Sequence, residues 1–302
     1  MSSPRPRVRT WRRTLRALAL EGRARAARSG ADGLVRDRTG TIAPAEGAGG
    51  RVASADEAGG SSGAADEISG ADGVLHLSPG PHATALALDR GPLAPPVLLR
   101  PRQGRLGDCW LMAPMLAVHE TAPERLRALI GEEADGIVTV RLPGLAEPLR
   151  MDRRLPVDAR GVFQYGRRDG ANPGWVGVLE KAIAGHIAGD YAFLQRGLAR
   201  YGFALLLGER VSTRLRLPDA GQVLAWRAEG RALCASTHPL SPRVPSAAGP
   251  LPPNHVFAVV GADAKSGHVH LRNPVRPAEL LVLDARSFRR GFLSVDVSAP
   301  LR

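Results

Sequence analysis

The chain has 302 residues, and 44% of them are hydrophobic, which is enough for one large folded domain with an appendage. Its formal net charge is +12, and arginine carries nearly all of the positive charge because the only lysines are Lys181 and Lys265. Two cysteines in so long a chain exclude a disulfide framework, and the lack of an apolar run of about 20 residues excludes a membrane span.

Residues 1–29 are predicted to form a basic, partly helical tail, in which Trp11, Leu15 and Leu18 recur at helical spacing among arginines. Two interpretations stay open: a solvated tail, and weak binding to nucleic acid or to anionic lipid. The tail lacks the interleaved aromatics that stack on bases, which disfavours nucleic acid. Residues 15–20 are too short and too broken by arginine for the core of a signal peptide, so we expect a cytoplasmic protein or one exported without a recognisable signal.

Residues 30–73 are predicted to be a disordered, acidic linker. Their composition is dominated by Ala, Gly and Ser, with Asp-Glu pairs starting at positions 56 and 66. Such a segment cannot bury enough apolar surface to become ordered. The prolines between residues 92 and 101 force extended backbone, so the start of the next region is expected to follow the domain surface.

Residues 74–302 are predicted to form one α+β domain, because helical patterns come first and strand patterns follow. The clearest helical pattern begins at Trp175, where apolar residues recur on one face. We expect helices over residues 109–119, 123–130, 175–194 and 219–228. We expect strands over residues 83–88, 137–142, 149–155, 232–235, 255–262, 269–272, 280–283 and 292–297.

A glycine-punctuated loop, residues 102–108, runs into the first of these helices. Gly104 and Gly107 let the backbone turn sharply, and Asp108 can cap the helix that follows. Cys109 then lies in the first helical turn, where unpaired N–H groups and the helix dipole favour a thiolate. A cysteine in this position is also an ordinary buried residue, so its meaning depends on partners elsewhere in the chain.

The sequence offers the partners that a thiol protease needs. His255 begins a predicted strand that is entered from a Pro/Gly loop, and it is the best candidate for the base. Asn273 ends the next strand, so hairpin pairing would place it beside His255 as the group that orients the imidazole. Gln103 and the backbone N–H of Cys109 are the candidate donors to an oxyanion.

Each of these residues also has a structural interpretation, and other residues compete for the same roles. A histidine that starts a strand is often structural, and an asparagine before proline often forms a turn. His238, His268 and His270 are alternative bases, although the alternation of the last two with Val269 turns them away from the core. Cys234 lies in an apolar run and is expected to be an inert core thiol.

The ordered set of Gln, Cys, His and Asn resembles the calpain family of cysteine proteases. The run from Gln103 to Leu111 is similar to the family's active-site signature. The resemblance extends over residues 92–298. Further similar segments follow in the same order: residues 153–157, the Leu-Glu-Lys-Ala run at 179–182, the strand from His255, residues 271–274, and residues 287–297.

The resemblance implies a papain-like fold, with a helical subdomain, a β-rich subdomain and the cleft between them. It also implies that Cys109 is the nucleophile, His255 the general base and acid, Asn273 the orienting residue and Gln103 an oxyanion donor. Two positions depart from the family pattern: Val275 replaces a tryptophan that covers the Asn–His hydrogen bond, and Asn254 replaces a glycine before the histidine.

Calpains are activated by calcium, but this sequence departs from the family at both sites. Glu180 matches one calcium-binding position, whereas Arg100 stands where the family has an aspartate, and a cation cannot bind an arginine. We therefore expect an Arg100–Glu180 ion pair in place of that site. The acidic loop of the second site is mostly missing after Pro274. The sequence predicts activity without calcium, without another metal and without a cofactor.

The favoured interpretation is a cysteine endopeptidase that acts on a protein or peptide, including its own linker as a candidate for self-cleavage. One alternative is another acyl transfer on the same fold, such as deamidation or transamidation, because the chemistry is shared up to the acyl-enzyme. Another is a catalytically silent domain kept for binding. Anionic-surface binding by the N-terminal tail would add to any of these roles.

Overall fold

The computed structural model describes residues 73–133, 135–209 and 211–301. The predicted N-terminal tail and the linker up to residue 72 lie outside these described residues. Helices and strands mix in the described part, as the α+β prediction requires. The helices are α2 (Cys109–His119), α3 (Pro123–Arg127), α4 (Gly174–Ile187), α5 (Ala199–Leu207), α6 (Ala220–Ala228) and α7 (Ala285–Gly291), with 3-10 turns η1 (Tyr191–Leu194) and η2 (Ser241–Arg243).

Six strands form the main sheet, in the order β12-β11-β10-β9-β13-β8. All of its pairings are antiparallel, including the β10–β11 hairpin that the sequence predicts. These strands are β8 (Ser212–Arg214), β9 (Arg231–Thr237), β10 (Val256–Asp263), β11 (His268–Asn273), β12 (Arg276–Leu283) and β13 (Phe292–Pro300).

Three smaller sheets lie in the first half of the described chain. Their pairings are β1–β6, β2–β7 and β3–β4–β5. The strands are β1 (Ala85–Leu88), β2 (Pro101–Arg102), β3 (Ile130–Glu132), β4 (Val138–Val140), β5 (Leu149–Met151), β6 (Arg154–Val157) and β7 (Arg167–Arg168). Among the described residues, no helix combines the length and the apolar character needed to cross a membrane.

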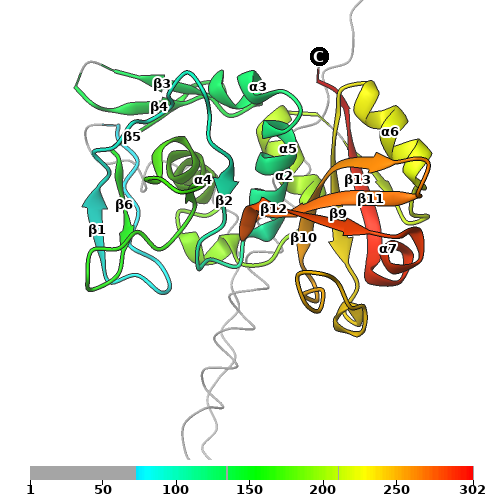
Figure 1. The fold of residues 1–302 in the computed structure, drawn as a ribbon. Coiled ribbons are helices and arrows are strands. Elements are labelled where there is room, and N and C mark those ends of the chain that lie inside the picture. Colours follow the sequence, from blue (N-terminus) through cyan, green and yellow to red (C-terminus); the bar gives the residue numbers. More distant parts are fainter. Residues whose placement is uncertain (1–72, 134, 210, 302) are drawn as a thin grey trace, which may run out of the picture. The chain divides into compact units, whose positions relative to one another are not determined.

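Helix α2 lies between these small sheets and the main sheet, as Figure 1 shows. Every residue from Trp110 to Val118 is buried, because α2 contacts α5 on one side and strands β9 and β10 on another. Gly202 of α5 allows the two helices to approach closely, since a Cβ there would lie 2.3 Å from the Trp110 carbonyl oxygen. The residue at the start of α2 is therefore held on a rigid, packed element.

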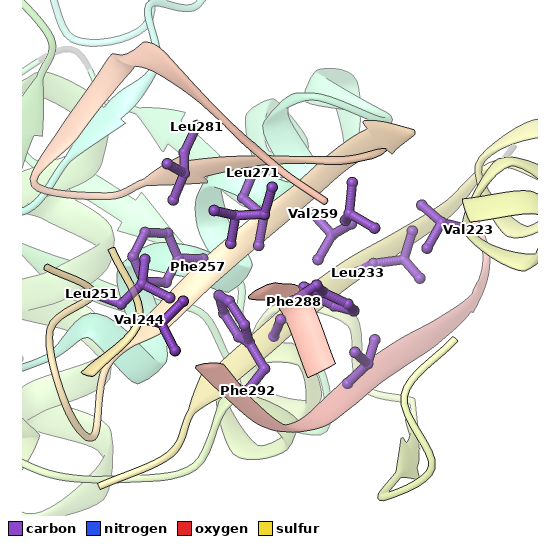
Figure 2. Packing of buried hydrophobic residues seen from close by; sticks show 14 of the residues in the cluster. Val223, Leu233, Val244, Leu251, Phe257, Val259, Leu271, Leu281, Phe288 and Phe292 are labelled. Atoms are coloured by element: carbon purple, nitrogen blue, oxygen red, sulfur yellow. The ribbon is translucent and has the colours of Figure 1, made fainter. Parts of the chain in front are cut away.

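The face of the main sheet away from α2 carries a large hydrophobic cluster (Figure 2). Alternate residues of its strands point into this cluster, where α6, α7 and the segment from Val244 to Leu251 cover them. Phe257, Phe288 and Phe292 are almost fully buried at its centre, with ring centroids 5.6 Å and 4.9 Å apart for the Phe257–Phe292 and Phe288–Phe292 pairs. Burial of each such aromatic side chain contributes about 2–3 kcal/mol. The strand that follows His255 is thus fixed from both faces.

Most predicted elements are present, and the differences have local causes. The helix predicted over 123–130 ends at Arg127, because Ile130 leaves it to pair with Val140 in β3–β4. The helix predicted over 175–194 ends at Ile187, and Gly189 then adopts a positive φ of 72° before the separate turn η1. Helices α5 and α7 were not predicted; α7 is short and highly charged, and its N-cap is set by the Asp284 side chain.

Candidate active site

The loop that precedes Cys109 is held by backbone contacts to two distant segments. The Gln103 N–H donates to the Pro274 carbonyl at 2.8 Å, and the Arg105 N–H donates to the Gln164 carbonyl at 2.8 Å. A Cβ at Gly104 would lie 2.3 Å from the same Gln164 oxygen, so this close approach requires glycine. The loop therefore connects the start of α2 directly to the residue after Asn273.

Cys109 is the first residue of α2 and is partly buried. Burial raises the pKa of its thiol to about 11, and the charge of Asp108 acts in the same direction. Hydrogen bonds from backbone N–H groups, including that of Val256, lower this pKa but do not offset the burial. The prediction that the helix start favours a thiolate is therefore wrong for the resting structure, because the loss of solvent outweighs the helix terminus.

His255 and Asn273 meet at the end of the β10–β11 hairpin. The Nε2 of His255 lies 2.9 Å from the Oδ1 of Asn273, so the N–H of the imidazole donates to the amide oxygen. The backbone of His255 is held by Thr237, whose hydroxyl accepts its N–H at 2.8 Å and whose own N–H donates to its carbonyl at 2.8 Å. The predicted hairpin thus brings the candidate base and its orienting residue together, with the second ring nitrogen left for a proton-transfer partner.

Burial lowers the pKa of His255, and the hydrogen bond to Asn273 opposes this shift. The imidazole is therefore neutral at pH 7 in the resting structure. Asn254 before it has a φ of 50°, the left-handed region that glycine and asparagine tolerate best. Asparagine at this position therefore meets the same backbone requirement as the glycine that the family commonly has.

Asn273 is fixed in turn by the chain that follows it. Its Oδ1 also accepts the N–H of Val275 at 3.0 Å, which closes a turn around the amide. The Val275 side chain is 40% exposed, so the hydrogen bond between His255 and Asn273 has a smaller cover than a tryptophan would give. The turn restricts the side chain of Asn273 directly.

Gln103 is buried in the loop, 7% exposed, and its amide nitrogen donates to the Leu106 carbonyl at 2.8 Å. The amide has a second hydrogen, and donation by that hydrogen to an oxyanion stays a prediction. The carbonyl oxygen of this amide has no hydrogen-bond partner. The side chain also interacts with the buried carboxyl of Asp108, so the Leu106 carbonyl and Asp108 together orient Gln103.

Asp108 and Glu180 form a buried carboxyl pair next to Cys109, which the sequence analysis missed. Both side chains are almost fully buried, and Asp108 makes no capping hydrogen bond to α2, contrary to expectation. Burial raises the pKa of Asp108 to about 7, partly offset by hydrogen bonding with Glu180. Burial and the Asp108 charge together raise the pKa of Glu180 well above its usual range. Two carboxylates cannot both ionise in such a site, so the pair holds a proton at neutral pH. A glutamate inside the apolar pattern of α4 was the available signal.

The predicted ion pair between Arg100 and Glu180 is wrong. The Nε of Arg100 lies 2.5 Å from Oε1 of Glu120, at the C-terminal end of α2. Glu180 instead accepts the N–H of Gly166 at 2.9 Å and faces Asp108. The Arg100 guanidinium therefore pairs with Glu120, which is partly exposed to solvent, whereas Glu180 is buried in the core and protonated.

The competing residues lie away from this arrangement. Cys234 is fully buried, as predicted, and burial raises the pKa of its thiol far above the usual range. His238 uses its Nδ1 to accept the N–H of Leu240 at 2.9 Å in an exposed turn. His268 and His270 are only partly buried on either side of the buried Val269. Within the described ranges, no group of three or more His, Cys, Asp or Glu residues could hold a metal ion.

Comparisons with known proteins match the segment that carries these residues. A family model described as calpain family cysteine protease matches residues 100–279. A calpain-type cysteine protease from Oryza sativa subsp. japonica is 29% identical over 190 residues. Similar proteins from Arabidopsis thaliana and Zea mays are each 28% identical, over 188 and 190 residues. Each match covers 57% of this chain but only 9% of the relative, so this chain spans a small fraction of the length of those proteins.

Proposed function

Because this chain belongs to the calpain family of cysteine proteases, we propose that it hydrolyses peptide bonds in protein substrates with Cys109 as the nucleophile. His255 is the general base and acid, Asn273 orients it, and Gln103 donates to the oxyanion. The observation that carries this proposal is the 2.9 Å contact between His255 and Asn273. The residue after His255, Val256, also donates its backbone N–H to the Cys109 sulfur, so this pair lies at the same end of α2 as the nucleophile.

The reaction starts from a neutral pair, because burial disfavours both the thiolate and the imidazolium. As the Cys109 sulfur attacks the carbonyl carbon, its proton passes to the free ring nitrogen of His255. The carbonyl oxygen becomes an oxyanion, which the Cys109 N–H and the Gln103 amide stabilise. The C–N bond then breaks, His255 returns the proton to the leaving amine, and a thioester remains on Cys109.

Water completes the turnover. His255 takes a proton from the water as its oxygen attacks the thioester carbonyl, and the C–S bond breaks when the second oxyanion collapses. His255 returns this proton to the sulfur, which restores the neutral pair. Asn273 holds the imidazole in one orientation through both halves of the reaction, and it does not exchange a proton itself.

We also propose a papain-like arrangement, in which the substrate lies where the helical part and the main sheet meet. The nucleophile is the first residue of α2, whereas the base directly precedes β10 and its partner ends β11; Figure 1 shows these elements. A peptide that contacts both groups must therefore bind across this junction. Strand β12, at the edge of the main sheet, contacts β2, which directly precedes Gln103, and the Gln103 N–H donates to the Pro274 carbonyl across this junction.

We further propose that activity is independent of calcium. Arg100 places a positive charge where the family has a calcium-binding aspartate, and its guanidinium is committed to Glu120. Glu180 shares a proton with Asp108 instead of carrying the full charge that a divalent ion prefers. Equal activity with calcium and with a chelator is the expected result, and activity that appears only with calcium would contradict this part of the proposal.

The test is labelling with a thiol-directed epoxide inhibitor, followed by mass spectrometry, in calcium and in chelator. We expect selective labelling of Cys109 over Cys234, loss of labelling in His255→Ala, and no effect of chelator. His268→Ala is the matched control, because it removes a histidine from the same hairpin at its far end. Failure to label Cys109 under either condition would contradict the protease and favour a silent binding domain. Labelling without peptide hydrolysis would favour another acyl transfer.

A further inference from the structure

The C-terminal end of α2 carries a charged cluster that links the three segments of the candidate site. Glu120 caps α2, the helix that begins at Cys109. Its Oε1 lies 2.5 Å from the Nε of Arg100, which stands three residues before Gln103. Its Oε2 lies 3.8 Å from the Nε of Arg272, which stands directly before Asn273. The Glu120 carboxylate therefore lies between Arg100, which precedes the loop that leads to Cys109, and Arg272, which lies in the strand that ends at Asn273.

This cluster is shielded enough to matter energetically. The side chains of Glu120 and Arg272 are 16% and 15% exposed, and that of Arg100 is 37% exposed. Partial burial disfavours the charge of Glu120, but hydrogen bonds from His119 and Arg100 and the charges of Arg100 and Arg272 prevail and lower its pKa to about 2. The carboxylate is therefore ionised throughout the neutral range, in a setting where ion pairs are screened less than at the surface.

Arg272 transmits this attachment to the turn that holds Asn273. Its Nη1 donates to the carbonyl oxygens of Pro277 and Ala278, both at 2.9 Å, so the same side chain closes the β11–β12 turn. The turn also accepts the Gln103 N–H through Pro274. Arg227 from α6 also donates to the backbone carbonyl of Glu120 at 2.9 Å, so a further arginine lies at the negative end of the α2 dipole.

We propose that Glu120 is a positioning residue, which docks the strand carrying Asn273 onto the helix carrying Cys109. This inference rests on the proposed function, since it assigns a role in aligning the same site. Glu120 lies eleven residues along α2 from Cys109, about 16 Å along the helix axis, so it acts through the scaffold and does not contact a substrate at the sulfur. The attachment is internal to the chain and needs no bound ion.

The test compares Glu120→Gln with Glu229→Gln. Glu229 is the control because it also caps a helix, α6, and also lies 2.5 Å from an arginine Nε, that of Arg231, but among the described residues its only ion pair is with that arginine and it forms none with Arg100 or Arg272. Hydrogen exchange measured by mass spectrometry reads the docking itself and requires no catalysis. In Glu120→Gln we expect exchange about tenfold faster in peptides that span residues 272–279 and 100–108, with unchanged exchange in the core of the main sheet. Glu229→Gln should match the wild type.

The kinetic arm separates positioning from stability. We expect kcat on an unfolded protein substrate to fall about tenfold or more in Glu120→Gln, with KM changed by less than about threefold. Should Glu120→Gln fail to fold, Arg100→Gln removes one partner of the carboxylate at a more exposed position and should shift both readouts in the same direction.

The outcomes separate this inference from the proposed function. Exchange in Glu120→Gln equal to that in Glu229→Gln would overturn the docking. Faster exchange with unchanged kcat would overturn the positioning role and leave Glu120 as a stabilising residue. Faster exchange in a protein whose wild type cleaves no peptide would support the docking and refute the proposed protease activity.

Discussion

Substitution of Gly104 by alanine offers the sharpest test of the loop that precedes Cys109. The new Cβ would lie 2.3 Å from the Gln164 carbonyl oxygen and 2.5 Å from the Tyr165 Cα and carbonyl carbon. These neighbours are backbone atoms, so no side-chain rotation relieves the contact. The loop must move by about 1 Å to restore ordinary van der Waals distances, and overpacking of this kind costs about 1–3 kcal/mol.

The displacement has a catalytic consequence because the loop links Gln103 to Cys109. A shift of about 1 Å in a catalytic group can lower the rate by about 10²-fold. It would also strain the 2.8 Å hydrogen bond from the Arg105 N–H to Gln164. We therefore expect Gly104→Ala to lower kcat by about 10²-fold and the free energy of unfolding by about 1–3 kcal/mol.

Gly107→Ala is the matched control in the same loop. A Cβ at Gly107 would meet only the side chain of Gln195, at 3.9 Å, which is an ordinary contact. Steady-state kinetics on an unfolded protein and urea denaturation would measure both variants. We expect Gly107→Ala to stay within about 0.5 kcal/mol of the wild type, as at sites without a special structural role. Similar kcat values for the two variants would refute the argument that backbone contact at Gly104 sets the position of Cys109.

Three further predictions concern the titrating and orienting groups. Glu180 keeps a proton in the folded protein that the unfolded chain releases above about pH 4.5. The free energy of unfolding therefore falls as the pH rises from about 4.5 toward the raised pKa of Glu180 in the folded protein. Glu180→Gln mimics the protonated form, and its gain in melting temperature over the wild type should therefore grow between about pH 5 and pH 8, whereas a constant difference would contradict the shared proton. Because the pKa of Cys109 is raised to about 11, its alkylation by iodoacetamide should keep accelerating above pH 9, and a plateau reached near neutral pH would show a thiolate instead. Asn273→Ala should lower kcat by about 10²-fold with little change in KM, because it frees the imidazole of His255 without removing a substrate contact. A change confined to KM would argue that Asn273 binds substrate.

Local rules predicted the parts of the site that depend on neighbours in sequence. The start of α2 at Cys109 follows from the glycine loop and the apolar run, and the structure confirms its bounds. The meeting of His255 with Asn273 follows from a single hairpin, since antiparallel pairing places the end of one strand beside the start of the other. In both cases no contact between distant segments was needed.

The parts that the sequence could not predict depend on burial and on distant contacts. Glu180 lies 72 residues after Asp108, and only the packing of α4 against α2 makes them a pair that shares a proton. The predicted partner of Arg100, Glu180, rests on charge and family position alone. In the fold, the C-terminal end of α2 lies beside Arg100, so Glu120 is its partner. The helix terminus at Cys109 was interpreted without the burial that dominates its pKa.

The electrostatics of the resting site explain why its alignment depends so strongly on the scaffold. A thiolate and an imidazolium attract each other and so help to orient themselves, but burial disfavours both charged forms here. A neutral thiol and a neutral imidazole gain little from mutual attraction, and their proton moves only as the sulfur attacks. The geometry must therefore be set beforehand by groups that do not react: the Asn273 amide, the Thr237 hydroxyl and, in our proposal, the carboxylate of Glu120. It follows that substitutions which loosen these supports should lower kcat even where they leave the pKa values of Cys109 and His255 unchanged.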